Sequence, residues 1–117
     1  MSPSLLRTHI LDTLELIADR EAQLCYQQRA PHLMVSTELL LQWEDWYRPD
    51  TPPMAWAFEA DELAALRAFH AVFVDVRNEV MFDAPPIQRF VQTAPWRRYH
   101  HAARATLSRL RPARAAA

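Results

Sequence analysis

Residues 59–82 read EADELAALRAFHAVFVDVRNEVMF, the longest stretch of the chain with unbroken helical periodicity. Apolar side chains recur there every three or four residues, and shorter ones form a second apolar side. They are Leu63, Leu66, Phe69, Phe73, Val76 and Val80, with Ala65, Ala68 and Val72 on the second side. Two apolar sides predict a central helix that contacts neighbours from more than one direction.

Nine prolines and no glycine mark the boundaries in the rest of the chain. Proline fits the first turn of a helix and disfavours helical geometry in the residue before it. The prolines and apolar spacing predict helices over 2–30, from an N-cap at Ser36 to residue 47, over 86–94 and over 93–110. Residues 48–58 hold three prolines and are predicted to form an ordered loop. No segment alternates as a strand does, so we expect an all-α fold, a compact bundle of four to five helices.

The length of 117 residues predicts one domain, over residues 1–111, with a frayed tail over 112–117. No apolar run approaches the roughly 18 residues that a membrane span needs, and the first residues lack a leader pattern. We therefore expect a cytoplasmic protein without a membrane partner. Cys25 is the only cysteine, which excludes an internal disulfide, and its helical context predicts a buried thiol.

Several enzyme classes are excluded by the lack of glycine. Phosphate-binding loops, dinucleotide-binding turns and the hydrolase nucleophile elbow need glycine for their backbone geometry. The candidates for a metal site are the carboxylates Glu59, Glu62, Asp75 and Glu79. Glu62 and Asp75, however, are thirteen residues apart on one helix, about 20 Å, and cannot share a metal ion. His100 and His101 are adjacent, so they point about 100° apart on a helix. We expect no enzyme activity, no cofactor and no metal ion.

The net charge of −1 conceals a polarised chain. Residues 1–83 carry all fourteen carboxylates and six arginines, whereas residues 84–117 carry seven arginines and no carboxylate. The basic end suggests a nucleic-acid-binding regulator that uses the arginine-rich C-terminal helix. The acidic remainder would repel the same phosphates, so we favour arginines that balance the acidic body, within the molecule or in a homodimer.

The four tryptophans divide into two groups. Trp43, Trp96 and Trp46 follow apolar helical stripes and are predicted to lie in the core. Trp56 lies in the proline-rich segment, among carboxylates, where it suits an exposed anchor for a protein partner. The predicted partner-binding surface consists of Glu44, Asp45, Asp50, Trp56, Glu59, Asp61 and Glu62.

The same middle region carries a family resemblance. It reads LLLQWEDW over residues 39–46, then the proline-rich segment, then FEADEL over residues 58–63, with Leu66, Phe69-His70 and Pro95-Trp96 further on. Over residues 36–110 this resembles the small helical immunity proteins encoded beside polymorphic or type VI secreted toxins of bacteria. The resemblance implies binding to a cognate toxin and neutralisation by covering its active site. An acidic surface would fit a toxin with a basic cleft, such as a nuclease.

Overall fold

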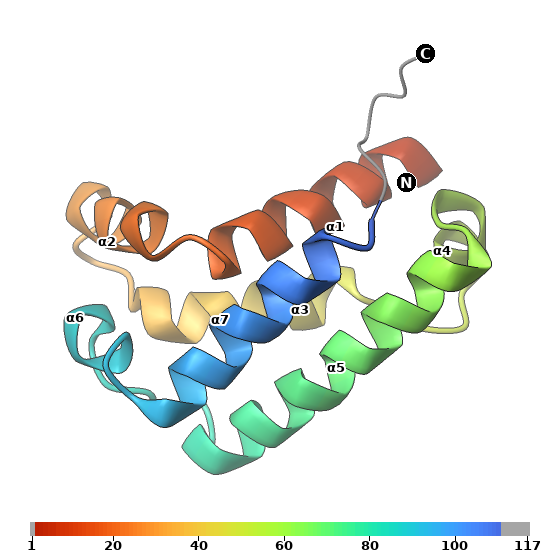
Figure 1. Cartoon of the computed structure of the whole chain (residues 1–117). Helices are drawn as coiled ribbons and strands as arrows, with labels where there is room; N and C mark the ends of the chain where they lie inside the picture. Colours follow the sequence, from red (N-terminus) through yellow and green to blue (C-terminus); the bar gives the residue numbers. More distant parts are fainter. Residues whose placement is uncertain (1, 111–117) are drawn as a thin grey trace.

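The computed structural model describes residues 2–110, and every regular element in that range is a helix (Figure 1). The helices are α1 (Pro3–Ile17), α2 (Arg20–Arg29), α3 (Val35–Trp46), α4 (Pro52–Ala57), α5 (Ala60–Val80), α6 (Ile87–Phe90) and α7 (Ala94–Leu107). The all-α prediction is confirmed, but the predicted count of four to five helices is wrong. The predicted frayed tail, residues 112–117, lies outside the described residues.

Helix α5 confirms the long helix predicted over residues 59–82, but on its predicted second apolar side only Ala65 is buried, whereas Ala68 is exposed. Its first turn is closed by Glu62, whose carboxylate accepts the N–H of Glu59 at 3.0 Å. Its last residue is followed by Met81 in the left-handed conformation, with φ 53°. The buried side chains of α5 include Leu66, Phe69, Phe73 and Val76, as the apolar spacing predicted.

The single helix predicted over residues 2–30 is wrong, because the chain breaks into α1 and α2 at residues 18–19. Asp19 is extended, and its side chain accepts the N–H of Ala22 at 3.0 Å, which starts a new helix. The fully buried Gln23 then donates to the carbonyls of Leu16 and Ile17, each at 3.0 Å. The side-chain amide oxygen of Gln23 accepts the indole N–H of Trp96 at 2.9 Å. Side-chain hydrogen bonds to α7 therefore stabilise a break that apolar spacing does not reveal.

Ser36 is not the N-cap of α3, contrary to the prediction. The helix begins at Val35, with Met34 as its N-cap, two residues earlier than predicted. The N–H of Val35 is accepted by the side chain of Gln27, at 3.1 Å. The hydroxyl of Ser36 donates instead to the carbonyl of Pro85. A side chain from α2 thus satisfies a free N–H at the start of α3.

Residues 48–58 are not a continuous loop, because residues 52–57 form α4. Pro52 and Pro53 occupy its first positions, where a proline costs no hydrogen bond and its fixed φ suits a helix. Met54 and Phe58 are buried, so the short helix is attached to the core. Pro52 and Pro53, which were predicted to belong to a loop, instead begin a helix.

The helices pack into a body with two distinct ends (Figure 1). Helix α1 contacts α3, α4 and α7, and α5 contacts α7. Helices α2 and α6 contact each other at one end, on the left, and α4 lies with the start of α5 at the other. In the core, the rings of Trp43 and Phe69 meet edge to face at 4.6 Å, and Phe69 stacks on Tyr99 at 5.3 Å. The Tyr99 hydroxyl donates to the carbonyl of Leu39 at 2.9 Å, which joins α7 to α3.

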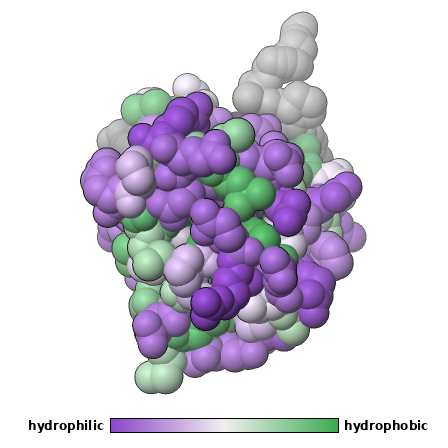
Figure 2. All heavy atoms as spheres, turned by 90° about the vertical axis from the view of Figure 1, so that its left-hand side faces the viewer, coloured by the Kyte–Doolittle hydropathy of each residue, from purple (hydrophilic) through white to green (hydrophobic). Residues whose placement is uncertain are grey.

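The end formed by α2 and α6 is predominantly hydrophilic, with a narrow hydrophobic strip (Figure 2). Cys25 on α2 is exposed, so the prediction of a buried thiol is wrong. Helix α2 buries the side that carries Gln23, and Cys25 follows two positions later on a different side of the helix. No helix within residues 2–110 has the length and apolar character required to cross a membrane.

Candidate functional site

Trp56 is exposed, as predicted, and it is held on an anchored element. Its relative exposure of 71% is high for so large an apolar side chain, and it lies on α4, between the buried Met54 and Phe58. The other tryptophans differ, because Trp43 and Trp96 are buried and confirm the core prediction. Trp46 is half-buried and stacks on His9 at 3.9 Å between ring centroids.

Four of the predicted carboxylates lie at the same end of the molecule as Trp56. Asp45 is near the end of α3, Asp50 precedes α4, Glu59 precedes α5, and Asp61 is in the first turn of α5. All four are exposed. The negative charges of Glu59 and Asp61 lie at the N-terminal end of α5, where the helix dipole is positive. They therefore stabilise the helix whether or not they bind a partner. We call Asp45, Asp50, Trp56, Glu59 and Asp61 the Trp56 surface.

Glu44 is next to Asp45 on α3, but its carboxylate is engaged by α5. Its carboxylate pairs with the guanidinium of Arg77 at 3.3 Å, next to the C-terminal half of α5. Arg77 is sixteen residues beyond Asp61, or about 24 Å along the helix at 1.5 Å per residue. Glu44 therefore lies beside a different part of α5 from the one next to Trp56.

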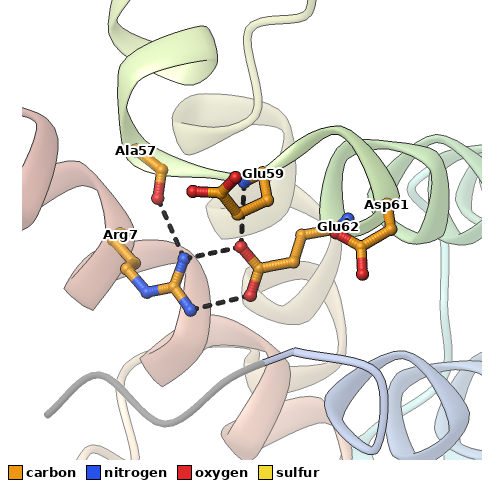
Figure 3. A network of polar contacts seen from close by, with 5 residues as sticks. All are labelled: Arg7, Ala57, Glu59, Asp61 and Glu62. Carbon is orange, nitrogen blue, oxygen red and sulfur yellow. Dashed lines mark hydrogen bonds and ion pairs between the residues drawn. The ribbon is translucent and has the colours of Figure 1, made fainter. Parts of the chain in front are cut away.

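Glu62 is 1% exposed, and the prediction that it belongs to an exposed acidic surface is wrong. Arg7 of α1 donates to both of its carboxylate oxygens, from Nη1 at 3.1 Å and from Nη2 at 2.9 Å (Figure 3). Nη1 also donates to the carbonyl of Ala57 at 2.9 Å, and the guanidinium lies 4.9 Å from the centre of the Phe58 ring. Because a buried carboxylate requires such pairing, Glu62 is used to join α1 to the junction of α4 and α5. That junction in turn positions Trp56.

A hollow of about 400 Å³ lies where residues 47–55 meet α5. Tyr47, Asp50 and Arg67 line it together with apolar side chains. Burial raises the pKa of the Tyr47 hydroxyl, Arg67 opposes that rise, and Asp50 adds to it. Sequence reasoning missed this hollow, since no motif relates Tyr47 to a residue twenty positions further on.

His70 on α5 accepts a hydrogen bond from the indole N–H of Trp43 through Nδ1, at 3.1 Å. Its ring lies 4.9 Å from that of Tyr47 and 5.4 Å from that of Phe73. Burial lowers the pKa of His70, Arg77 lowers it further, and Glu44 opposes both. The neutral imidazole therefore serves as an acceptor within the aromatic core.

No family model, curated protein or solved structure matches the chain. The chemistry of the surface must follow from its own residues. Within residues 2–110 no group of three histidine, cysteine or carboxylate side chains is placed to hold a metal ion. What the Trp56 surface offers is a large apolar ring on a fixed helix, surrounded by carboxylates.

The arginines of α7 are partly engaged by neighbouring groups. Arg98 forms an ion pair with Glu79 of α5, and Arg97 donates to the carbonyl of Gln92 at 3.1 Å. Arg104 lines a shallow hollow that also exposes Glu15 of α1 and Glu21 of α2. These contacts favour arginines that balance the acidic body over a continuous track for phosphates.

Proposed function

We propose that this protein is an immunity protein, which binds a cognate bacterial toxin and covers its active site with the Trp56 surface. The observation that carries the proposal is the 71% exposure of Trp56 on a short helix that the buried Met54 and Phe58 attach to the core. Tryptophan is enriched among the residues that dominate binding energy at protein interfaces.

The support beneath Trp56 also favours binding. Met54 and Phe58 attach α4 to the core, and Arg7 holds the carbonyl of Ala57. A side chain presented on a fixed backbone loses less conformational freedom on binding than one on a mobile loop. The anchor is therefore prepared for a partner before contact.

The charge of the surface indicates the kind of partner. Asp45, Asp50, Glu59 and Asp61 would be attracted to a basic cleft, and carboxylates can take the places of substrate phosphates there. A nuclease toxin has such a cleft. The resemblance of residues 36–110 to immunity proteins supports the same class of partner.

The test is coexpression with the product of the adjacent gene, followed by measurement of affinity. The wild-type chain should copurify with that product as a one-to-one complex and suppress its toxicity. Trp56→Ala should weaken binding by at least about thirtyfold, because a central anchor contributes more than about 2 kcal/mol.

Met81→Ala is the matched control, since it also removes an exposed large apolar side chain, at the far end of α5. It should leave the affinity unchanged. Equal affinities for the wild type and Trp56→Ala would show that the surface is placed wrongly, and absence of any complex would contradict the immunity function.

A further inference from the structure

The hollow beside residues 47–55 has the size and lining of a small-molecule site. Its volume of about 400 Å³ lies within the range of roughly 300–1,000 Å³ typical of ligand pockets. Met54, which is buried, and Leu63, which is half-buried, provide apolar surface in it. Four polar side chains line it, namely Tyr47, Asp50, Thr51 and Arg67. The Thr51 hydroxyl donates to the carbonyl of Arg48, so its proton is already engaged.

Two hydrogen-bond donors in the hollow are open to a ligand. Tyr47 is 7% exposed, and its hydroxyl makes no hydrogen bond to any residue within 2–110. No buried side-chain polar atom of the described residues lacks a partner, so this hydroxyl must be reached by solvent. Arg67 is exposed and likewise has no ion pair or hydrogen bond in the described part of the chain.

The same hollow holds one negative charge that does not neutralise Arg67. Asp50 lines it, yet among residues 2–110 no ion pair within 4.0 Å joins Asp50 to any arginine. The backbone of Asp50 has φ 64°, a left-handed conformation that aspartate tolerates better than most residues. Arg67 and Asp50 line the same hollow as the Tyr47 hydroxyl. Opposite charges that share a hollow without pairing are suited to a dipolar ligand.

We propose that this hollow binds a free α-amino acid with an apolar side chain. Arg67 and the Tyr47 hydroxyl would donate to its carboxylate, and Asp50 would accept from its ammonium group. The side chain would lie against Met54 and Leu63, which supply the apolar contact. This site does not depend on the proposed toxin partner, although Asp50 also belongs to the Trp56 surface.

The test is titration of the ¹⁵N-labelled chain with L-leucine, followed by NMR. Millimolar leucine should shift the amide resonances of the non-proline residues among 47–55 and those of residues 63 and 67, and leave those of α2 unchanged. Leucinamide, which lacks the carboxylate, and N-acetyl-leucine, which lacks the ammonium group, should each bind at least about tenfold more weakly. Glycine, which lacks a side chain, should also bind more weakly.

Variants separate this site from the partner surface. Arg67→Gln and Tyr47→Phe should each weaken leucine binding, whereas Arg29→Gln, an exposed arginine of α2, should not. Either of the first two variants alone decides the matter if the other fails to fold. The proposal is overturned if about 10 mM leucine shifts no resonance around the hollow, or if both derivatives bind as leucine does. If Arg67→Gln loses leucine binding but keeps toxin binding, the hollow and the Trp56 surface act independently.

Discussion

Arg7 and Glu62 are separated by 55 positions in the chain and meet as the most deeply buried ion pair within residues 2–110. Two parallel hydrogen bonds join them, and Glu62 also accepts the N–H of Glu59. The attraction offsets desolvation only while both partners are present. Removing one therefore costs more than the pair contributes to stability.

Glu62→Ala should lower the free energy of unfolding by about 3 kcal/mol, since it leaves the largely buried Arg7 guanidinium without its carboxylate and removes a helix cap. Urea unfolding at neutral pH measures this loss. Glu79→Ala breaks the ion pair with Arg98, whose partners are both about half exposed, and should cost less than about 1 kcal/mol. Equal losses would mean that the buried pair has no special role.

His70 should make stability depend on pH. Its pKa is lowered in the folded chain, by burial first and then by Arg77, so the unfolded chain binds the proton more readily. The stabilising contribution is present above the ordinary value of 6.5 and is lost as the pH falls below it, towards the lowered folded pKa. His70→Asn retains an acceptor for Trp43 and cannot titrate. Unfolding free energies between pH 7 and 5 should fall more steeply for the wild type, and parallel curves would contradict this.

At the scale of single elements, a chain without glycine must end its helices differently. Helix α5 is followed by Met81 and Phe82, both left-handed, with φ 53° and 58°. A side chain with a Cβ atom pays roughly 1 kcal/mol for this conformation, whereas glycine does not. Met81 is 77% exposed, so burial of its side chain does not offset the conformational cost.

Met81→Gly should therefore raise the free energy of unfolding by about 1 kcal/mol relative to Met81→Ala, which keeps the Cβ atom. Thermal or urea unfolding of the two variants gives the difference directly. Equal stabilities would show that the left-handed turn is not strained.

The longest and most regular elements could be predicted, and the short ones could not. Helices α5 and α7 follow their apolar spacing, and Thr93 caps α7 as the sequence indicated. The α1–α2 break and α4 were missed. A hydrogen bond from the Gln23 side chain stabilises the break, and the burial of Met54 stabilises α4. Neither contact can be inferred from the spacing of apolar residues.

At the scale of the whole molecule, charge is unevenly distributed. Among the α7 arginines, Arg98 is paired with Glu79, and Arg104 lines a hollow that Glu15 and Glu21 also line. The carboxylates of the Trp56 surface are all exposed, at the end of the molecule that carries Trp56. This arrangement would steer a basic partner towards one end of the molecule.

If the partner has a basic cleft, its association rate constant with this chain should fall steeply as salt rises from low to high ionic strength. Stopped-flow mixing with the adjacent gene's product measures it. Neutralising Asp50, Glu59 and Asp61 together should slow association and flatten the salt dependence. The same charge change at Asp12, Glu15 and Glu21 should have a smaller effect, and the reverse order would contradict the assigned surface.

The sequence by itself determined the all-α class, the helices α5 and α7 and the exposure of Trp56, because periodicity and proline placement act over a few neighbouring residues. Only the tertiary structure decided which carboxylates are available. Glu62 and Asp61 are adjacent on α5, yet one is buried against Arg7 and the other is exposed. The hollow lined by Tyr47, Asp50 and Arg67 also forms only when residues 47–55 pack against α5. Which side of a helix faces a neighbour depends on packing between distant segments, and that is not encoded in any local pattern.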